Sequence, residues 1–174
     1  MKKFMACVWS VLLVLALAAC GGGNAEVPVG TTALETTEAE NVQMPNPWQE
    51  CDTLEEAGKL AGFPFTAPET VEGFDEKYIA AIPGDVAEVI FSSKENENLE
   101  VMFRKGTGDE DISGDYNTYE NMDTKEMDGK NVTIKGTEGL VYTATWVQDG
   151  FSYAISAREG VSVEQMEQWV QALA

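Results

Sequence analysis

Hydrophobic residues recur at helical spacing in two segments of the chain. Thr53 and Glu56 form a capping box, in which a hydroxyl and a carboxylate three residues apart satisfy the free N–H groups at a helix start. Gly62 follows the last apolar position, so a helix over residues 53–61 is predicted. Ser162 and Gln165 form a second capping box, and a second helix is predicted on the apolar stripe Val163, Met166, Val170 and Leu173.

Between these segments the hydrophobic pattern changes to period two, which is typical of half-buried strands. The alternating segments are residues 78–82, 86–92, 99–104, 125–127, 131–135, 140–146 and 151–157. Asp128-Gly129 and Asp149-Gly150 fit tight hairpin turns. The predicted fold class is therefore α+β. We expect a curved antiparallel sheet of about seven strands in meander order, with an N-terminal and a C-terminal helix packed on one face.

The first 19 residues have the pattern of a secretory signal. Lys2 and Lys3 precede residues 4–19, which carry no charge and are apolar apart from Ser10. The segment 17–20, Leu-Ala-Ala-Cys, resembles the signal of a bacterial lipoprotein. That resemblance implies cleavage between Ala19 and Cys20 and attachment of a diacylglycerol to the Cys20 thiol. The alternatives are an ordinary signal peptide with a chance cysteine, or a retained anchor helix, and each of them exports the domain.

Three segments are therefore expected. Residues 1–19 are the lipoprotein signal peptide, residues 20–47 are the lipidated cysteine and a flexible acidic tether, and residues 48–174 are a single α+β domain. The expected location is the extracytoplasmic face of the cell membrane, with membrane lipid bound through Cys20.

Charge and composition exclude several classes of function. The chain has a net charge of −19, and loss of Lys2 and Lys3 with the signal leaves 9 basic against 30 acidic residues, a net charge of −21. Such a charge repels nucleic acid, so no nucleic-acid partner is expected. The sequence contains no histidine, which removes Ser-His-Asp triads and histidine-based zinc sites. Cys51 is the one cysteine left after lipidation of Cys20, so a disulfide within the mature chain is excluded and Cys51 is interpreted as structural.

A twelve-residue window, 109–120, is close to the pattern of a calcium-binding loop. Its candidate ligands are Asp109, Asp111, Ser113, Asp115, Asn117 and Glu120, with Gly114 at the sharp turn. The window differs from the pattern at Ser113 and Tyr116, and a predicted strand precedes it instead of a helix. The alternative is a long loop whose carboxylates are neutralised by Arg104, Lys105 or backbone N–H groups. A structural calcium ion is the one cofactor that the sequence suggests, and no cofactor is required.

Aromatic side chains on two neighbouring predicted strands give a second candidate site. An apolar pocket could be lined by Tyr142, Trp146, Phe151 and Tyr153. The alternative interpretation is that these side chains belong to the core beneath the helices.

Several segments are similar to the exported domain known as domain-of-unknown-function family 4367, and the likeness spans residues 46–173. The main one is 111–117, Asp-Ile-Ser-Gly-Asp-Tyr-Asn, and the others are Asn46-Pro47-Trp48, Leu54-Glu55-Glu56-Ala57 with Ala61-Gly62-Phe63, Ala144-x-Trp146 and Tyr153-Ala154-Ile155. The resemblance implies an extracytoplasmic domain of Gram-positive bacteria. It supplies no catalytic residues.

The sequence favours a lipid-anchored, non-enzymatic binding or sensing module, whose ligand is a small molecule or an envelope protein. One alternative is a hydrolase that uses a pair of carboxylates, although no catalytic residue can be singled out. Another is a structural envelope protein that docks a protein partner, and a carrier of an apolar ligand is a fourth hypothesis.

Overall fold

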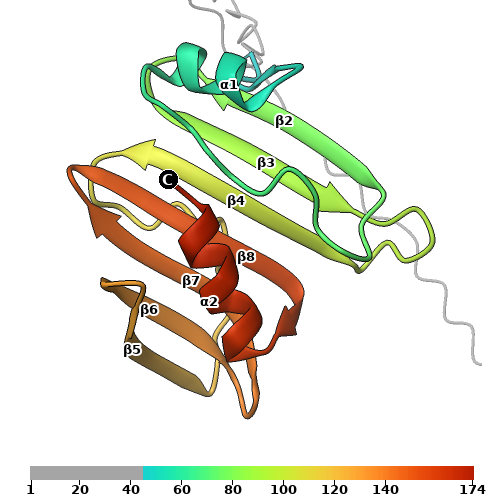
Figure 1. Cartoon of the computed structure of the whole chain (residues 1–174), viewed down its shortest axis with the longest axis vertical. Helices are drawn as coiled ribbons and strands as arrows, with labels where there is room; N and C mark the ends of the chain where they lie inside the picture. Colours follow the sequence, from blue (N-terminus) through green and yellow to red (C-terminus); the bar gives the residue numbers. More distant parts are fainter. Residues whose placement is uncertain (1–44) are drawn as a thin grey trace, which may run out of the picture. The chain divides into compact units, whose positions relative to one another are not determined.

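The computed structural model describes residues 45–174, so the signal segment, Ala19, Cys20 and most of the predicted tether lie outside the described residues. Residues 45–174 form one compact unit. Its strands and helices, shown in Figure 1, are β1 (Gln49–Glu50), α1 (Leu54–Ala61), β2 (Glu76–Ile82), β3 (Val86–Ser92), β4 (Glu100–Thr107), β5 (Asn121–Met127), β6 (Lys130–Thr137), β7 (Leu140–Gln148), β8 (Phe151–Val161) and α2 (Val163–Ala172). None of the helices in residues 45–174 is long and apolar enough to cross a membrane.

All eight strands of this unit belong to one open antiparallel sheet, in the order β1-β2-β3-β4-β8-β7-β6-β5. Consecutive strands are neighbours from β1 to β4 and again from β5 to β8. The prediction of meander order is wrong at the centre, where β4 pairs with β8 and Phe103 lies opposite Ile155. The connection after β4 therefore has to travel from the middle of the sheet to its edge at β5.

Both helices begin at the N-cap residues that the capping boxes predicted, through the hydroxyl half of each box. The return contact differs, because the Glu56 carboxylate accepts from the Asp52 N–H and the Gln165 amide donates to Gln168. The Thr53 hydroxyl accepts a hydrogen bond from the Glu56 N–H at 3.1 Å, and the Ser162 hydroxyl accepts one from the Gln165 N–H at 3.2 Å. Gly62 ends α1 in the left-handed conformation at φ 88°, which glycine adopts without strain. The buried residues of both helices join a single hydrophobic cluster with the strand side chains of one sheet face.

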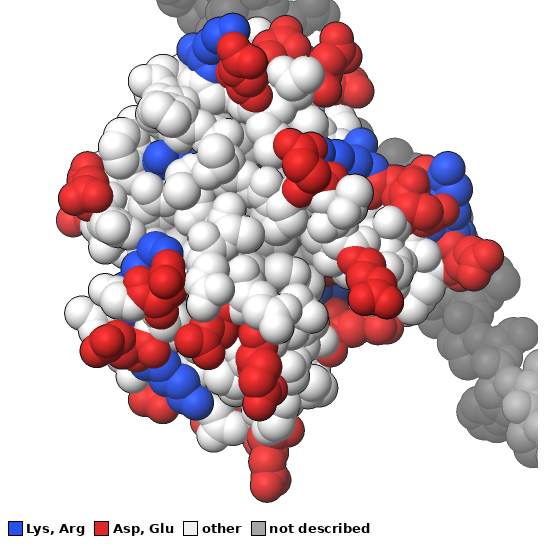
Figure 2. Space-filling model, viewed as in Figure 1, with Lys and Arg blue, Asp and Glu red and all other residues white. Residues whose placement is uncertain are grey.

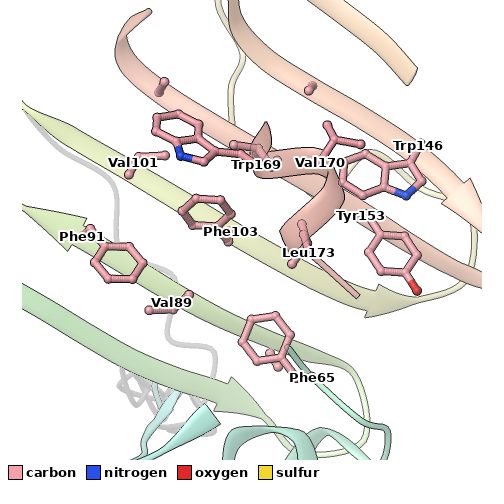
Figure 3. Close-up of a cluster of buried hydrophobic side chains, with 14 of the residues drawn as sticks. Phe65, Val89, Phe91, Val101, Phe103, Trp146, Tyr153, Trp169, Val170 and Leu173 are labelled. Carbon is pink, nitrogen blue, oxygen red and sulfur yellow. The ribbon is translucent and has the colours of Figure 1, made fainter. Parts of the chain in front are cut away.

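The centre of that core is a row of aromatic rings between the sheet and α2 (Figure 3). The rings of Phe91 and Phe103 meet edge to face at 5.9 Å between centroids, and those of Phe103 and Trp169 at 5.6 Å. Residues 65–66 bring the segment after α1 against the end of the chain. The Thr66 N–H donates to the Ala174 carbonyl at 2.8 Å, and the Ala174 N–H donates to the Thr66 carbonyl at 3.0 Å.

The charged side chains on the helix-bearing face lie mostly towards its rim, as Figure 2 shows, and acidic ones predominate. The middle of this face is largely uncharged. The acidic surface that the composition predicts is therefore uneven on this side of the molecule.

Candidate functional site

The connection between β4 and β5, residues 108–120, crosses the sheet face opposite the helices; we call it the crossing loop. Three strands hold it there. Arg104 of β4 donates through Nη1 to the Ile112 carbonyl at 3.0 Å, and the Ser156 hydroxyl of β8 donates to the Ser113 carbonyl at 3.0 Å. Lys135 of β6 donates to the Asp111 carboxylate at 2.9 Å. The loop is thus a second layer on the sheet.

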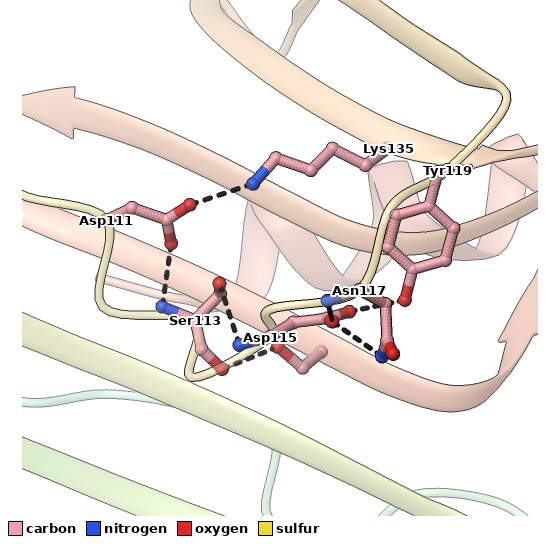
Figure 4. A network of polar contacts seen from close by, with 7 residues as sticks. Asp111, Ser113, Asp115, Asn117, Tyr119 and Lys135 are labelled. Carbon is pink, nitrogen blue, oxygen red and sulfur yellow. Dashed lines mark hydrogen bonds and ion pairs between the residues drawn. The ribbon is translucent and has the colours of Figure 1, made fainter.

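Polar side chains at every second position form hydrogen bonds with the backbone of the crossing loop (Figure 4). The Asp111 carboxylate accepts from the Ser113 N–H at 2.9 Å, the Ser113 hydroxyl from the Asp115 N–H at 3.3 Å, and the Asp115 carboxylate from the Asn117 N–H at 2.8 Å. Each side chain therefore satisfies the backbone donor two residues further on, as in Asx turns. This is the physical role of the segment 111–117 that carries the family resemblance.

A buried ion pair lies beneath this loop. Arg104 donates through Nε to the Glu88 carboxylate at 2.7 Å, and the Trp48 ring covers the guanidinium with its centroid 5.3 Å from Cζ. Glu88 is 5% exposed, and its burial raises the pKa of its carboxyl although Arg104 partly offsets the effect. Gly114 has φ +68°, and a Cβ there would lie 2.9 Å from Nη1 of Arg104. The loop can approach the guanidinium this closely because Gly114 has no side chain.

Beside the crossing loop the same face is hollowed into a groove of about 570 Å³, which we call the tyrosine groove. Met102 lines it from β4, and Arg104 and Arg158, the only two arginines in the sequence, line it too. The loop contributes Tyr116, whose side chain is 97% exposed. The remaining lining residues are Ile90, Glu100, Ser113, Gly114, Asp115, Asn117, Tyr119, Tyr142, Ser156 and Ala157.

Two further tyrosines of the groove stack on one another. The rings of Tyr119 and Tyr142 are 5.1 Å apart between centroids, with an interplanar angle of 25°. The Tyr119 hydroxyl donates to the Asp115 carboxylate, and burial together with this hydrogen bond raises the pKa of Tyr119 to about 12. Tyr119 is thus a neutral donor at ordinary pH, fixed between Asp115 and the Tyr142 ring.

Tyr142 does not share a face with Trp146, contrary to the sequence prediction. Opposite β6, Lys135 pairs with Thr143 and the next residue, Gly136, pairs with Val141, so Tyr142 is an extra residue on β7 and forms a β-bulge. A bulge adds one residue to a strand and so changes which side chains point to a given face. Tyr142 therefore stacks on the crossing loop, whereas Trp146 belongs to the hydrophobic core.

The six candidate calcium ligands are spread along the loop rather than gathered. Asp109 and Asp111 line a hollow of about 210 Å³ near the turn end of β7 and β8, and Glu120 lines a different hollow beside β5. The other three, Ser113, Asp115 and Asn117, line the tyrosine groove. Among residues 45–174 no three acidic or cysteine side chains are grouped so that they could hold a metal ion.

Within the chain, Lys135 would compete with calcium for the Asp111 carboxylate. Lys135 is paired with Asp111, and hydrogen bonds from Ser113 and Lys135 outweigh the effect of burial and lower the pKa of Asp111. Neutralisation of the loop thus comes from Lys135 and backbone N–H groups, while Arg104 pairs with Glu88 and Lys105 points to the other face. Calcium binding stays a hypothesis, and it requires Asp111 to leave Lys135.

The other three residues of the predicted apolar pocket pack in or beside the core. The rings of Trp146 and Tyr153 stack at 5.1 Å between centroids, and both side chains also edge the 210 Å³ hollow that contains Asp109. Phe151 lies against the ammonium group of Lys105, with Nζ 4.8 Å from the ring centroid. The space between the rings of Phe151 and Tyr153 is thus filled by a lysine rather than left open for a ligand.

The sequence suggested Lys105 only as a possible counter-charge for the loop carboxylates, and its buried position was missed. Its side chain is 7% exposed, donates to the Pro64 carbonyl at 2.8 Å and forms no ion pair within residues 45–174. Burial lowers the pKa of its ammonium group. Lys105 comes two residues after Phe103, so it continues the apolar side of the predicted strand 99–104. That position was the available signal.

The Glu88–Arg104 pair was missed as well. Glu88 interrupts an apolar strand and Arg104 ends the next one, but the distance between them depends on the register of β3 against β4, which places the two residues opposite one another.

Comparison of the chain with protein-family models, curated proteins and solved structures gives no match. The family resemblance and the functions it implies therefore stay predictions.

Proposed function

We propose that this chain is a lipid-anchored, non-enzymatic binding domain on the outer face of the cell membrane, and that its ligand site is the tyrosine groove. The observation that carries the proposal is Tyr116. Its side chain is 97% exposed, yet it stands on a segment whose neighbour Ser113 is only 1% exposed. An aromatic ring held in water on a fixed backbone loses little entropy when a ligand covers it.

The groove suits a polar ligand that also has flat apolar faces. Tyr116 offers a ring for stacking, and Met102 offers an apolar surface. Asn117 and Arg158 add hydrogen-bond donors at the rim, and Arg158 is already oriented by the Glu100 carboxylate at 2.8 Å. Cell-wall fragments that combine sugar rings, short peptides and carboxylates have this chemistry, and an extracytoplasmic domain would meet them.

The test is isothermal titration calorimetry, in which soluble peptidoglycan fragments are titrated into the full chain. Tyr116→Ala is expected to weaken binding about tenfold, which corresponds to ~1.4 kcal/mol for one lost aromatic contact. Val147→Ala is the control, because Val147 is an exposed apolar residue (54%) on β7 that does not line the groove. Absence of binding to the wild-type chain, or an equal loss in both variants, would reject the groove as the site.

A protein-docking role is the second candidate, and the helix-bearing face favours it. The largely uncharged middle of that face (Figure 2) is the kind of surface that a protein partner covers. A hollow of about 650 Å³ beside α1, lined by Phe63, Pro64 and Phe65, adds an apolar recess to the molecule. A partner that protects this recess, and leaves the tyrosine groove exposed, would favour docking over ligand binding.

The hydrolase alternative has less support. Glu100 and Asp115 are the two carboxylic side chains that line the tyrosine groove. Glu100 is paired with Arg158, and Asp115 accepts hydrogen bonds from Asn117 and Tyr119. Both carboxyl groups therefore already bind partners within the chain, and no third carboxyl group lines the groove.

A further inference from the structure

Among residues 45–174 no strand covers the outer edge of the sheet at β5. In that part of the chain β5 pairs with β6 alone, and its residues from Asn121 to Glu126 are exposed or half-buried. The backbone N–H of Thr124 donates to the Asp123 carboxylate at 2.8 Å rather than to β6, so it faces outward. Such an edge offers a row of backbone donors and acceptors to another strand.

Two unpaired charges lie on this edge. Every basic side chain outside the core forms an ion pair within residues 45–174, except Lys125. Asp123, two residues earlier, also has no basic partner in that part of the chain. The two side chains lie on the same sheet face, because they oppose Ile134 and Val132 of β6. In a chain with net charge −19, a lysine without a carboxylate partner is unusual.

We infer that β5 pairs antiparallel with β5 of a second copy of this chain, with Thr124 at the two-fold axis. In that register Asp123 of each copy faces Lys125 of the other, so two opposite-charge pairs form. The two neighbouring registers that keep side chains on the correct faces are centred on Asp123 or on Lys125, and each of them opposes like charges. Charge complementarity therefore selects one register. Charges on a sheet edge usually prevent pairing because they meet a like or apolar neighbour, and in this register they meet their opposites instead.

The surroundings of β5 fit a strand-to-strand contact. Met122 on this strand is 72% exposed, and Leu140 nearby is 39% exposed. Both line a hollow of about 460 Å³ that extends to Ile134 and also includes Asp123 and Lys125. Pairing of two copies at this edge would cover apolar surface from each of them, in addition to the ion pairs.

The experiment is analytical ultracentrifugation of the full chain in a density-matched detergent, over about 10 µM to 1 mM, the range expected for a small interface. The wild-type chain is expected to form dimers reversibly. Lys125→Asp places two acidic residues on each edge, and Asp123→Lys places two lysines there. For each variant alone the dissociation constant of the dimer is expected to rise about tenfold or more, because two attractive pairs become repulsive.

Two recombinations separate pairing from a general effect of charge. An equimolar mixture of the two single variants restores Asp–Lys pairing between unlike copies, and the double variant Asp123→Lys/Lys125→Asp restores it between like copies. Both should dimerise as the wild type does. A wild-type chain that stays monomeric throughout, or a dimer indifferent to these exchanges, overturns the inference and leaves the edge to a strand of another protein or to none. Unchanged thermal unfolding of all variants shows that the fold is intact.

Discussion

At the scale of single residues, Gly114 shows why the crossing loop has its sequence. The residue combines a left-handed backbone with a position directly above the Arg104 guanidinium. The side chains around it form hydrogen bonds at every second position, and a glycine is required where backbone and guanidinium meet. The loop therefore depends on a residue that contributes no side-chain contact of its own.

Gly114→Ala is expected to destabilise the domain by about 3 kcal/mol, since it adds left-handed strain of ~1–2 kcal/mol to a collision with a buried charged group. Gly108→Ala is the matched control. Gly108 has φ +90°, and no atom lies within 4 Å of the place that an added methyl group would take, so the strain alone, about 1 kcal/mol, should appear. Urea denaturation measures both free energies of unfolding. Equal losses in the two variants would show that the contact with Arg104 does not matter.

At the scale of elements, the structure of the crossing loop leads us to expect no calcium binding at millimolar concentration. We expect that about 5 mM calcium leaves the melting temperature within ~1 °C, because Asp111 is held by Lys135 and the six candidate ligands are divided among three hollows. A site with a dissociation constant of about 1 mM would raise the melting temperature by ~3 °C or more. A rise of that size, reversed by a chelator and absent with magnesium, would restore the calcium interpretation.

The elements themselves were largely predictable from the sequence. Both N-caps and both Asp-Gly turns depend on contacts within a few residues, and the structure confirms them, with Asp128 and Asp149 in the left-handed conformation that such turns need. β1 was missed because two residues are too short to show a period. The existence of the longer strands could therefore be predicted from the local hydrophobic pattern.

Strand order and the sites were less predictable, because they depend on contacts distant in sequence. Nothing local distinguishes a β4 that neighbours β5 from one that neighbours β8. The bulge of β7 against β6 moved Tyr142 to the crossing loop, and the pairing of β3 with β4 brought Glu88 to Arg104. The composition of the tyrosine groove follows from these three facts, so sequence reasoning could name some of its residues but not gather them.

At the scale of the whole molecule, the proposed anchor can be tested separately from the domain. Cys20→Ala is expected to move the full chain from the membrane fraction to the soluble fraction of an expressing bacterium, and to abolish the mass increase of a diacylglycerol on the intact protein. Cys51→Ala is the control, because Cys51 is buried in the domain core and should leave the chain in the membrane fraction. A Cys20→Ala chain that stays with the membrane and keeps its signal segment would favour the retained anchor helix instead.

The hydrogen bonds between Thr66 and Ala174 have a consequence for the order of folding. They join residues 108 positions apart, and Leu173, fully buried, packs beside them. A chain that leaves an export channel from its N-terminus would present α1 and the first four strands long before the segment that covers them. Phe65 and Phe103 of that half would stay exposed to solvent until residues 163–174 emerge. The chain is therefore most prone to aggregation in that interval.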